Sequence, residues 1–396
     1  MKIVYVDETF HPAYGYQSNP LAKFQKRQGH DVTIITVSKD QLYPSFTNFG
    51  ATAETIDEDD RIYTENTGVK IIRVKTKGYF MHRAVLSPEV FRKVRTEKPD
   101  VVFVHCVETL TSMRFLVHRK EWPLMFDSHM LTMASRYKHV GIYEKFYRAF
   151  FRRIIEKHHY YVIRTQDDDY VNSHLGIKKE LTPFISFGTD TLLFRPSPEN
   201  RRKFRAQYGI GEDSFVVIYT GKLTQAKGGL FLAETFREKF DIDLTLVCVG
   251  SPPDNEYGGK VRQALERSEN RVVLFPTQRY VELAPFYQMA DLSVFPKQCS
   301  MSFYDAQACG LPVVSEDNNV NRDRCSHGNG AVFNAGDAAD FRAKILQFAA
   351  MRREEYEQYS RNARAFIEAG YDYADIAEQY TEYLKKSIVN DRSARK

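Results

Sequence analysis

Short, nearly continuous apolar runs alternate with amphipathic stretches along the first half of the chain. The runs are rich in Val, Ile and Phe and cover residues 2–7, 31–37, 70–76, 100–105, 123–129, 160–166 and 181–187. The stretches at 20–30, 88–98 and 142–159 have the apolar spacing of helices. Strands that are apolar on both faces and alternate with helices predict a parallel sheet with helices on both sides.

The same alternation starts again after a turn-rich connection at residues 187–204, which contains Gly188, Pro196 and Pro198. A second set of strands is predicted at 214–221, 243–250, 271–277, 291–296, 311–317 and 330–334. Helices are predicted at 229–240, 255–268, 281–290 and 303–309 and over most of the remaining chain. The pattern therefore indicates an α/β protein with two Rossmann-like, doubly wound domains.

These patterns predict a first domain over residues 1–195 and a second over 196–370. We expect residues 371–396 to form a C-terminal helix that crosses back to the first domain and ends in a disordered tail. Open parallel sheets bind ligands beyond the carboxyl ends of their strands, so two facing sheets would create a cleft.

The amino-acid composition limits the kinds of binding partner that we expect for this protein. The 396 residues include 56 Lys and Arg against 51 Asp and Glu, a mild net charge of +5. That balance suits an anionic small molecule or a peripheral membrane contact, but no basic run accompanies a nucleic-acid recognition motif. No apolar run is long enough to span a bilayer, so we expect a cytoplasmic protein, with peripheral contact at the inner face of the membrane left open. The five cysteines lack paired spacing, which predicts reduced thiols and makes zinc binding improbable: Cys106, Cys248, Cys299, Cys309 and Cys325.

Two lysines and three glycines follow the first strand of the second domain. The strand ends at Gly221, Lys222 follows directly, and Lys227 precedes Gly228 and Gly229 at a helix start. Cations beside a helix start form a site for an anion, most plausibly a diphosphate. Two solvated lysines in a loop are the alternative. The segment fits neither the GxGxxG nor the GxxxxGK[ST] motif, which disfavours dinucleotide oxidoreductases and P-loop NTPases.

Other candidate ligands follow other predicted strands. Asp305 comes shortly after one and could accept hydrogen bonds from both ribose hydroxyls, although an acidic residue at a helix start also has a purely structural use. Gly250 and Gly15 permit close backbone approach to a ligand, or simply form turns. His129 ends a strand of the first domain, where a functional role competes with a structural one.

In order and spacing, these segments resemble the retaining GT-B glycosyltransferases of glycosyltransferase family four (group 1). FISFGTDTLLFRP resembles the family's IPNGVDxxxFxP, TGKLTQAKGG resembles GRLxxxKG, and YDAQACGLPVV resembles EAMACGLPVV. GNGAVFNAGDAADFRAKI resembles the family's GxNGxLxxxxDxxxLAxxI. Residues 1–36 resemble the family's opening strand, glycine loop and second strand, which carries the GHxV motif. The resemblance covers about 380 residues, nearly the whole chain.

The resemblance implies an N-terminal acceptor domain and a C-terminal domain that holds a nucleoside diphosphate sugar, with UDP favoured over GDP. It assigns Lys222 and Lys227 to the diphosphate and to the charge on the leaving group, and Asp305 to the ribose. His129 matches a histidine near the donor sugar, so the catalytic set is His129, Lys222 and Lys227. The remaining donor-binding assignments are Gly15, Tyr16, Gly221, Gly250, Thr277, Arg279, Ser300, Met301 and Ser302. Tyr16 replaces the second glycine of the usual loop.

One segment departs from the family. Lys297 stands where the family has the first Glu of its E-x7-E pair, and KQCS replaces EGFG. Backbone groups of Ser300, Met301 and Ser302 must then hold the sugar and phosphates, or sugar recognition has changed. The alternatives are a catalytically altered sugar-nucleotide binding protein and an epimerase of the same fold.

The resemblance also implies transfer to an acceptor hydroxyl with retained configuration, in surface-polysaccharide or glycoconjugate synthesis. Lysines and helix termini supply the positive charge, so we expect no metal or cofactor. The DxD string at residues 166–170 precedes a helix and is better explained as a cap. We expect a glycan, lipid-linked or small-molecule acceptor near the polar loop at 38–61.

The helix at residues 142–161 leaves two interpretations open. Its basic face could lie on an anionic membrane. Alternatively, Phe146, Phe150 and Ile154 pack inward and the basic face is solvated, which a doubly wound sheet favours.

Overall fold

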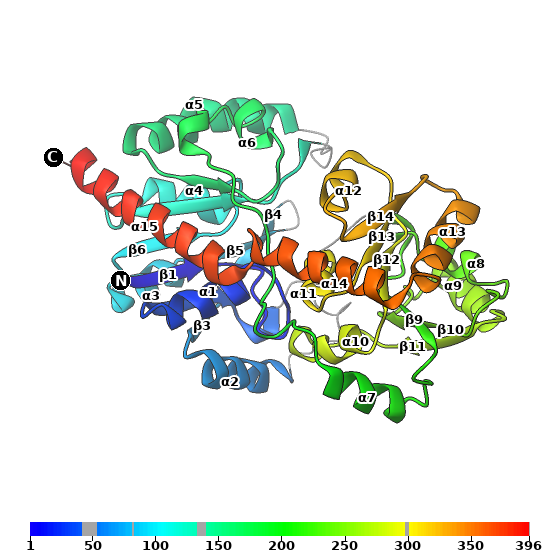
Figure 1. Ribbon diagram of the computed structural model, residues 1–396. Helices are drawn as coiled ribbons and strands as arrows, with labels where there is room; N and C mark the ends of the chain where they lie inside the picture. The colour runs from blue at the N-terminus through cyan, green and yellow to red at the C-terminus, as the bar shows by residue number, and fades with distance from the viewer. Residues whose placement is uncertain (42–53, 81–82, 133–139, 298–300, 396) are drawn as a thin grey trace. The chain divides into compact units, whose positions relative to one another are not determined.

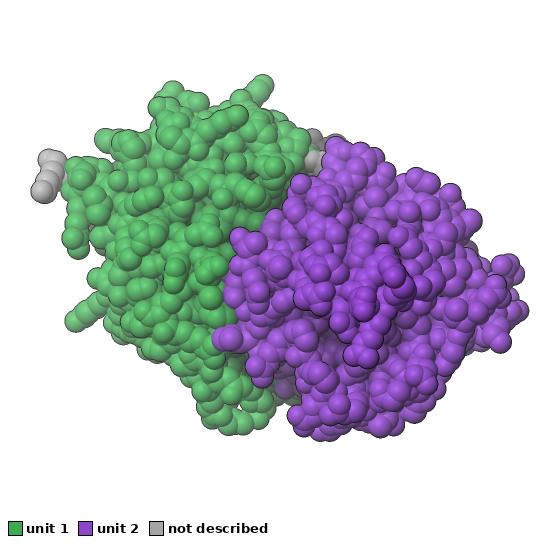
Figure 2. Space-filling model, in the orientation of Figure 1, with its two compact units in different colours: residues 1–187, 373–396 green, residues 188–372 purple. Residues whose placement is uncertain are grey.

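The computed structural model describes residues 1–41, 54–80, 83–132, 140–297 and 301–395. The chain forms two compact units (Figure 2), one of residues 1–187 and 373–396 and one of residues 188–372. Each unit contains one six-stranded parallel sheet with helices interleaved between its strands. The predicted α/β class with two doubly wound parallel sheets is therefore confirmed.

In unit 1 the strands lie in the order β3-β2-β1-β6-β7-β8, and every neighbouring pair is parallel. Figure 1 labels β1, β3 and β6 of this sheet. The strands are β1 (Lys2–Val6), β2 (Asp31–Val37), β3 (Lys70–Val74), β6 (Val101–Val104), β7 (Leu124–Ser128) and β8 (Val162–Arg164). The helices of this unit are α1 (Ser18–Arg27), α2 (Ile56–Thr67), α3 (Glu89–Glu97), α4 (Leu110–Val117), α5 (Val140–His158), α6 (Tyr170–Ser173) and α15 (Tyr373–Arg395).

The two faces of this sheet are buried by different helices because successive side chains of a strand point in opposite directions. Val4 and Val6 of β1 belong to the core that α3, α4 and α5 cover. Tyr5 points to the other face, where its hydroxyl donates to Gln25 Oε1 of α1 at 2.6 Å. On that face Phe103 of β6 packs edge-on against Tyr380 of α15, with ring centroids 5.8 Å apart.

Unit 2 repeats the topology with the order β11-β10-β9-β12-β13-β14, again entirely parallel. Its strands are β9 (Phe215–Thr220), β10 (Leu244–Val249), β11 (Arg271–Phe275), β12 (Leu292–Phe295), β13 (Val313–Glu316) and β14 (Gly330–Phe333). Its helices are α7 (Pro198–Gln207), α8 (Gly229–Thr235), α9 (Glu256–Glu266), α10 (Ala284–Gln288), α11 (Ser302–Ala308), α12 (Asn319–Arg324), α13 (Ala338–Ala349) and α14 (Arg353–Glu368). The core on one face joins β9, β10 and β12 to α8, α9 and α13.

The C-terminal helix α15 is part of unit 1 and runs to Arg395. Gln28 Nε2 donates to the carbonyl of Ala374 near its start, at 3.0 Å. Near its end the buried Asp391 accepts a hydrogen bond from the Tyr160 hydroxyl at 2.9 Å. The expected disorder of the tail from residue 390 is therefore wrong for the residues described, because this buried contact continues the helix.

Two local predictions also differ from the structure. The run at 181–187 forms only an isolated bridge between Phe184 and Arg164, since Pro183 has no N–H to extend a ladder. The hairpin of β4 (Thr76–Phe80) and β5 (Arg83–Leu86) was not predicted.

Residues 42–53 of the proposed acceptor loop lie outside the described residues. None of the described helices is long and apolar enough to cross a membrane.

The ends of β9 and β10 approach so closely that a side chain is excluded at Gly250. Its φ is 140°, and a Cβ there would lie 2.1 Å from the carbonyl oxygen of Gly221. The simple-turn interpretation of Gly250 thus has a specific physical basis, the close packing of two neighbouring strand ends.

We expect Gly250→Ala to destabilise the protein by about 3 kcal/mol. The added methyl group would overlap the Gly221 carbonyl, and alanine is strained at a positive φ. Gly259→Ala is the matched control, since nothing lies within 4 Å of a Cβ there. In helix α9 it should stabilise by roughly 0.5–1 kcal/mol. Urea denaturation of the two variants checks this, and equal midpoints would contradict the packing account.

Candidate functional site

In each unit the strand order reverses at one point, between β1 and β6 in unit 1 and between β9 and β12 in unit 2. The connections leave these two strands in opposite directions, and open parallel sheets bind ligands at the carboxyl ends of strands at such a reversal. Polar and charged residues follow these strands in both units. They are carboxylates and histidines in unit 1, and lysines in unit 2.

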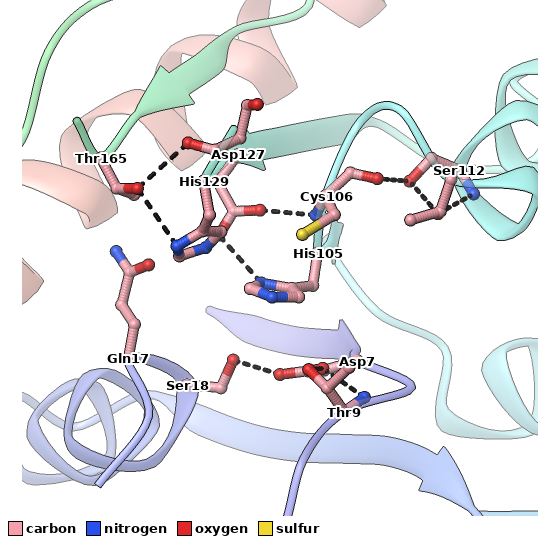
Figure 3. A network of polar contacts seen from close by, with 12 residues as sticks. Asp7, Thr9, Gln17, Ser18, His105, Cys106, Ser112, Asp127, His129 and Thr165 are labelled. Carbon is pink, nitrogen blue, oxygen red and sulfur yellow. Dashed lines mark hydrogen bonds and ion pairs between the residues drawn. The ribbon is translucent and has the colours of Figure 1, made fainter. Parts of the chain in front are cut away.

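The carboxylate of Asp127 organises the carboxyl end of the sheet in unit 1 (Figure 3). Its Oδ2 lies 3.1 Å from His105 Nδ1 and 3.0 Å from His129 Nε2. Its Oδ1 accepts the backbone N–H of Cys106 at 2.6 Å. Burial alone would raise the pKa of Asp127, but the two histidines hold it well below its usual range. The carboxylate is therefore ionised and joins β6 to β7.

His129 has polar contacts at both ring nitrogens. Nε2 faces Asp127, and Nδ1 lies 3.1 Å from Thr165 Oγ1, whose hydroxyl also contacts the carbonyl of Ser128 at 3.1 Å. Phe187 stacks on the ring with centroids 5.2 Å apart. Burial lowers the pKa of His129, which favours a neutral imidazole. The ring is held in a fixed orientation at the end of β7, where the sequence predicted it.

His105 carries the positive charge of this cluster. Burial opposes protonation, but Asp127 and Asp7 raise the pKa of His105 well above its usual value. Asp7 follows β1 and accepts hydrogen bonds from Thr9 Oγ1 at 2.7 Å and Ser18 Oγ at 2.6 Å. The imidazolium thus has carboxylates near it from two strands.

Cys106 adopts a φ of 60°, which is unusual for a residue with a side chain. Its N–H is held by Asp127, and its carbonyl accepts the Ser112 hydroxyl at 2.8 Å. The thiol is buried, and burial raises its pKa to about 12. The structure places no disulfide between the four described cysteines, and the expectation of reduced thiols stays a prediction.

A second polar group in unit 1 surrounds Arg83. Glu8 is fully buried beside it, with Arg83 Nε 3.4 Å from Glu8 Oε1. Burial raises the pKa of Glu8 to about 7, and that of Glu108 also lies above its usual value because of burial. Neither Glu8 oxygen has a hydrogen-bond partner within the described residues. Such buried groups are uncommon, and a bound water, ion or polar ligand beside them is one physical explanation.

In unit 2, the turn that carries Lys227 packs against the end of β12. A Cβ added at Gly228 would lie 3.1 Å from Cβ of Lys297. Lys222 is the second residue after β9, the strand that pairs with β12. Burial lowers the pKa of Lys222, which is only partly exposed. Three lysines therefore follow the two strands at which the order of this sheet reverses.

Asp305 occupies a buried position in α11, where it is 2% exposed. Its Oδ1 accepts hydrogen bonds from Thr189 Oγ1 at 2.6 Å and from the Tyr280 hydroxyl at 3.2 Å. Burial raises its pKa to about 7. The structure thus gives this carboxylate a definite internal role within unit 2, and its assignment to a ribose stays a prediction.

The remaining assigned residues lie in loops or at helix starts. Thr277 and Arg279 are partly exposed in the segment after β11, and Met301 and Ser302 begin α11, where the Met301 carbonyl accepts the N–H of Tyr304 at 2.9 Å. Ser300 and Gln298 lie outside the described residues.

In unit 1, Gly15 and Tyr16 lie between β1 and α1. The Tyr16 ring is 41% exposed and meets Tyr14 edge-on. The expected cap by the DxD string is met only in part. Asp168 Oδ1 accepts the N–H of Tyr170, the first residue of α6, but Asp169 at the N-cap position makes no side-chain capping bond.

Sequence reasoning missed most of the polar cluster in unit 1. Asp7, His105, Asp127 and Thr165 each lie at or just after the carboxyl end of a buried strand. That position was the available signal, because parallel strands bring their carboxyl ends to one edge of a sheet.

Two family models match the chain. Residues 200–366 match the family described as glycosyl transferases group 1, and residues 15–167 match the glycosyl transferase 4-like domain. The chain therefore belongs to the group 1 glycosyl transferases, with the two-domain architecture called GT-B.

Solved structures share this fold over nearly the whole chain. A glycosyltransferase from Rickettsia africae ESF-5 aligns with a TM-score of 0.74 and 14% identity, covering 98% of each chain. Anabaena Alr3699/HepE, solved in complex with UDP and glucose, aligns with a TM-score of 0.70 and 20% identity, covering 98% of this chain and all of the other. At these identities the likeness concerns the fold.

Among curated relatives, D-inositol 3-phosphate glycosyltransferase 1 of Catenulispora acidiphila is 30% identical over 164 residues, 38% of either chain. The chain thus matches less than two fifths of the length of the first such relatives, at 38% and 36%.

The buried Asp305 carboxyl gives a testable dependence of stability on pH. It ionises near 3.8 in an ordinary setting and at about 7 in the fold, so raising the pH between these values destabilises the native state. Asp305→Asn keeps an acceptor oxygen without the charge. Relative to wild type it should gain stability between pH 4 and pH 8, by at most about 4 kcal/mol.

Urea unfolding followed by circular dichroism at several pH values measures this difference. Asp254→Asn, at an exposed position of the same unit, should follow the wild-type response. A difference between Asp305→Asn and wild type that stays constant with pH would contradict the account.

Proposed function

We propose that the chain is a retaining glycosyltransferase that moves a sugar from a nucleoside diphosphate sugar to an acceptor hydroxyl. The observation that carries the proposal is the group of lysines at the strand reversal of unit 2 in a member of this family. Lys222 and Lys227 are the diphosphate ligands in this proposal, and they balance charge on the leaving group. UDP is favoured over GDP, and the complex of Anabaena HepE with UDP and glucose supports that choice.

The proposed donor chemistry needs no metal or cofactor. Fixed cations offset the developing charge on the diphosphate, which is the task that Mg²⁺ or Mn²⁺ has in other phosphate sites. The Asp305 carboxylate is buried and accepts hydrogen bonds from Thr189 and Tyr280, which makes it a poor nucleophile for a covalent intermediate. We therefore propose same-face attack assisted by the leaving phosphate, with the protein providing orientation.

Lys297 favours a second candidate function, that of a sugar-nucleotide binding protein with altered or lost transfer. It replaces a carboxylate that the resemblance places at the donor sugar, and its charge acts on Glu316 at the end of β13. Burial raises the pKa of Glu316 and Lys297 opposes that rise, so the two side chains influence each other electrostatically.

Unit 1 is the proposed acceptor domain. Buried Glu8, with Arg83 and Glu108 beside it, offers acceptors and donors for the hydroxyl groups of a glycan, lipid-linked or small-molecule acceptor. We propose a role at the cytoplasmic face of the membrane, in surface-polysaccharide or glycoconjugate synthesis.

Helix α5 supports the peripheral membrane contact. The expectation that Phe146 and Phe150 pack inward is wrong, because they are 49% and 58% exposed, whereas Tyr147, Phe151 and Ile155 are buried. Ile142 is 70% exposed on the same face. Arg153 and Lys157 are exposed on this face, and Lys145 is exposed beside it. A helix face with both apolar and basic side chains is suited to an anionic membrane surface.

Assay of UDP and GDP release from a panel of nucleotide sugars, with and without simple acceptors, tests the proposed function. Transfer or slow donor hydrolysis with one sugar supports it, and equal rates with and without added Mg²⁺ or Mn²⁺ support metal-independent transfer. Tight nucleotide binding without turnover of any donor would favour the second candidate.

We expect Lys227→Ala to weaken UDP binding roughly 10- to 150-fold, since a charge-assisted hydrogen bond contributes about 1.5–3 kcal/mol. Titration calorimetry gives the affinity. Lys239→Ala, at an exposed lysine of the same unit, should bind as wild type does. Unchanged affinity in Lys227→Ala would show that this lysine is not a diphosphate ligand.

We expect the double variant Phe146→Ser and Phe150→Ser to lower binding to phosphatidylcholine–phosphatidylglycerol vesicles at least about tenfold, because each Phe contributes buried apolar area. Val117→Ser, at a 61% exposed residue of α4, is the control. Vesicle sedimentation measures the bound fraction. If wild type and the double variant bind equally, α5 is not the membrane contact.

A further inference from the structure

Three charged side chains lie near one another beside the strand reversal of unit 1. Glu8 is the second residue after β1, Glu108 is the fourth after β6, and Arg83 begins β5. We infer that Glu8 and Glu108 bind a protonated amino group, so that the acceptor is an amine-bearing molecule such as an amino sugar. This inference rests on the proposed function and narrows its acceptor. It leaves His129 and the donor residues of unit 2 in the roles already proposed.

The unpaired polar atoms of this group are mostly hydrogen-bond acceptors. Neither oxygen of Glu8 has a hydrogen-bond partner among the described residues, although its side chain is fully buried. Glu108 Oε2 and Arg83 Nη2 are likewise buried and unpaired within that part of the chain. Three carboxylate oxygens therefore face one guanidinium nitrogen. An ammonium group has three N–H donors and no acceptor, so it complements such a site better than a hydroxyl group does.

The charges of the surrounding groups also favour a bound cation. Burial raises the pKa of Glu8 to about 7 and that of Glu108 above its usual value, and Arg83 only partly opposes these rises. Burial keeps His129 largely neutral. Among the described groups that act on one another here, Arg83 and the protonated His105 are the two cations, and the four carboxylates are Asp7, Glu8, Glu108 and Asp127. Surplus negative charge is costly in a buried setting, so an ammonium group would stabilise both glutamates in their ionised form.

The burial of the three side chains differs in a way that suits a small ligand. Glu8 is fully buried, whereas the Arg83 side chain is 31% exposed and Glu108 is half-buried. The Tyr143 hydroxyl donates to the Glu108 carbonyl at 2.5 Å, which anchors the segment after β6. A protonated amine has no lone pair for attack, so it orients the acceptor and the sugar is transferred to one of the acceptor's hydroxyl groups.

Binding of matched sugars to the full-length protein, without donor, tests the inference. The probes are the methyl glycosides of glucosamine, glucose and N-acetylglucosamine, and the corresponding three compounds of the galactose series. Titration calorimetry at neutral pH gives the affinities. We expect at least one amine to bind about tenfold more tightly than both of its uncharged counterparts, because charge-assisted hydrogen bonds are the stronger ones. Amines that bind no more tightly than their counterparts, or that do not bind, would overturn the inference.

Glu8→Gln keeps the shape of the side chain and removes its charge. It should lose at least about tenfold in affinity for the tightest-binding amine, with little change for the matching hydroxyl compound. Glu108→Gln should show the same selective loss and serves as the test if Glu8→Gln does not fold. Glu180→Gln, at an exposed glutamate of the same unit, should bind as wild type does. Equal losses for the two compounds, or unchanged affinity for the amine, would overturn the assignment.

UDP binding and donor turnover, measured on the same proteins, separate this inference from the proposed function. Wild type that binds UDP and releases it from a donor, but does not favour amines, contradicts the inference and leaves the proposed function standing. Amine selectivity without UDP binding or donor turnover would contradict the proposed function, and with it the identification of the amine as an acceptor.

Discussion

In a parallel sheet every strand delivers its carboxyl end to the same edge, and both six-stranded sheets of this chain obey that constraint. The strands must be apolar because helices bury both of their faces. Polar chemistry is consequently displaced to the residues that directly follow each strand. Asp7 and His105 occupy such positions, and Lys222 is the second residue after β9. The close approach of β9 and β10, which excludes a side chain at Gly250, follows from the same geometry.

The two units use one topology for opposite electrostatic environments. The edge in unit 1 holds carboxylates that are compensated by His105 and Arg83. Burial raises the pKa of Glu8 there, whereas the opposite charges of His105 and Asp127 outweigh burial, raising the pKa of His105 and lowering that of Asp127. The edge in unit 2 holds lysines beside tightly packed glycine turns. In the proposed division of roles, unit 2 binds an anionic donor and unit 1 binds a hydroxyl-bearing acceptor. The charges at the two edges support this division, whereas the strand order that the two units share does not distinguish them.

The fold could be predicted from the sequence because buried parallel strands leave an unmistakable apolar pattern. All six strands of unit 2 lie within their predicted ranges, whereas the run containing Pro183 failed because apolar content alone does not supply hydrogen-bond donors. On α5 the sequence did not show which aromatic residues face the core. The unit 1 cluster was missed because His105 and Asp127 are distant in sequence and meet only through strand pairing.

The central claim is that the chain transfers a sugar with retention of configuration. Proton NMR of the reaction as it proceeds, with a UDP-sugar whose anomeric configuration is known, tests it most directly. We predict that the first product signals carry the donor's anomeric configuration and rise together with free UDP. An inverted product, or an epimerised sugar without a glycosidic product, would contradict the account.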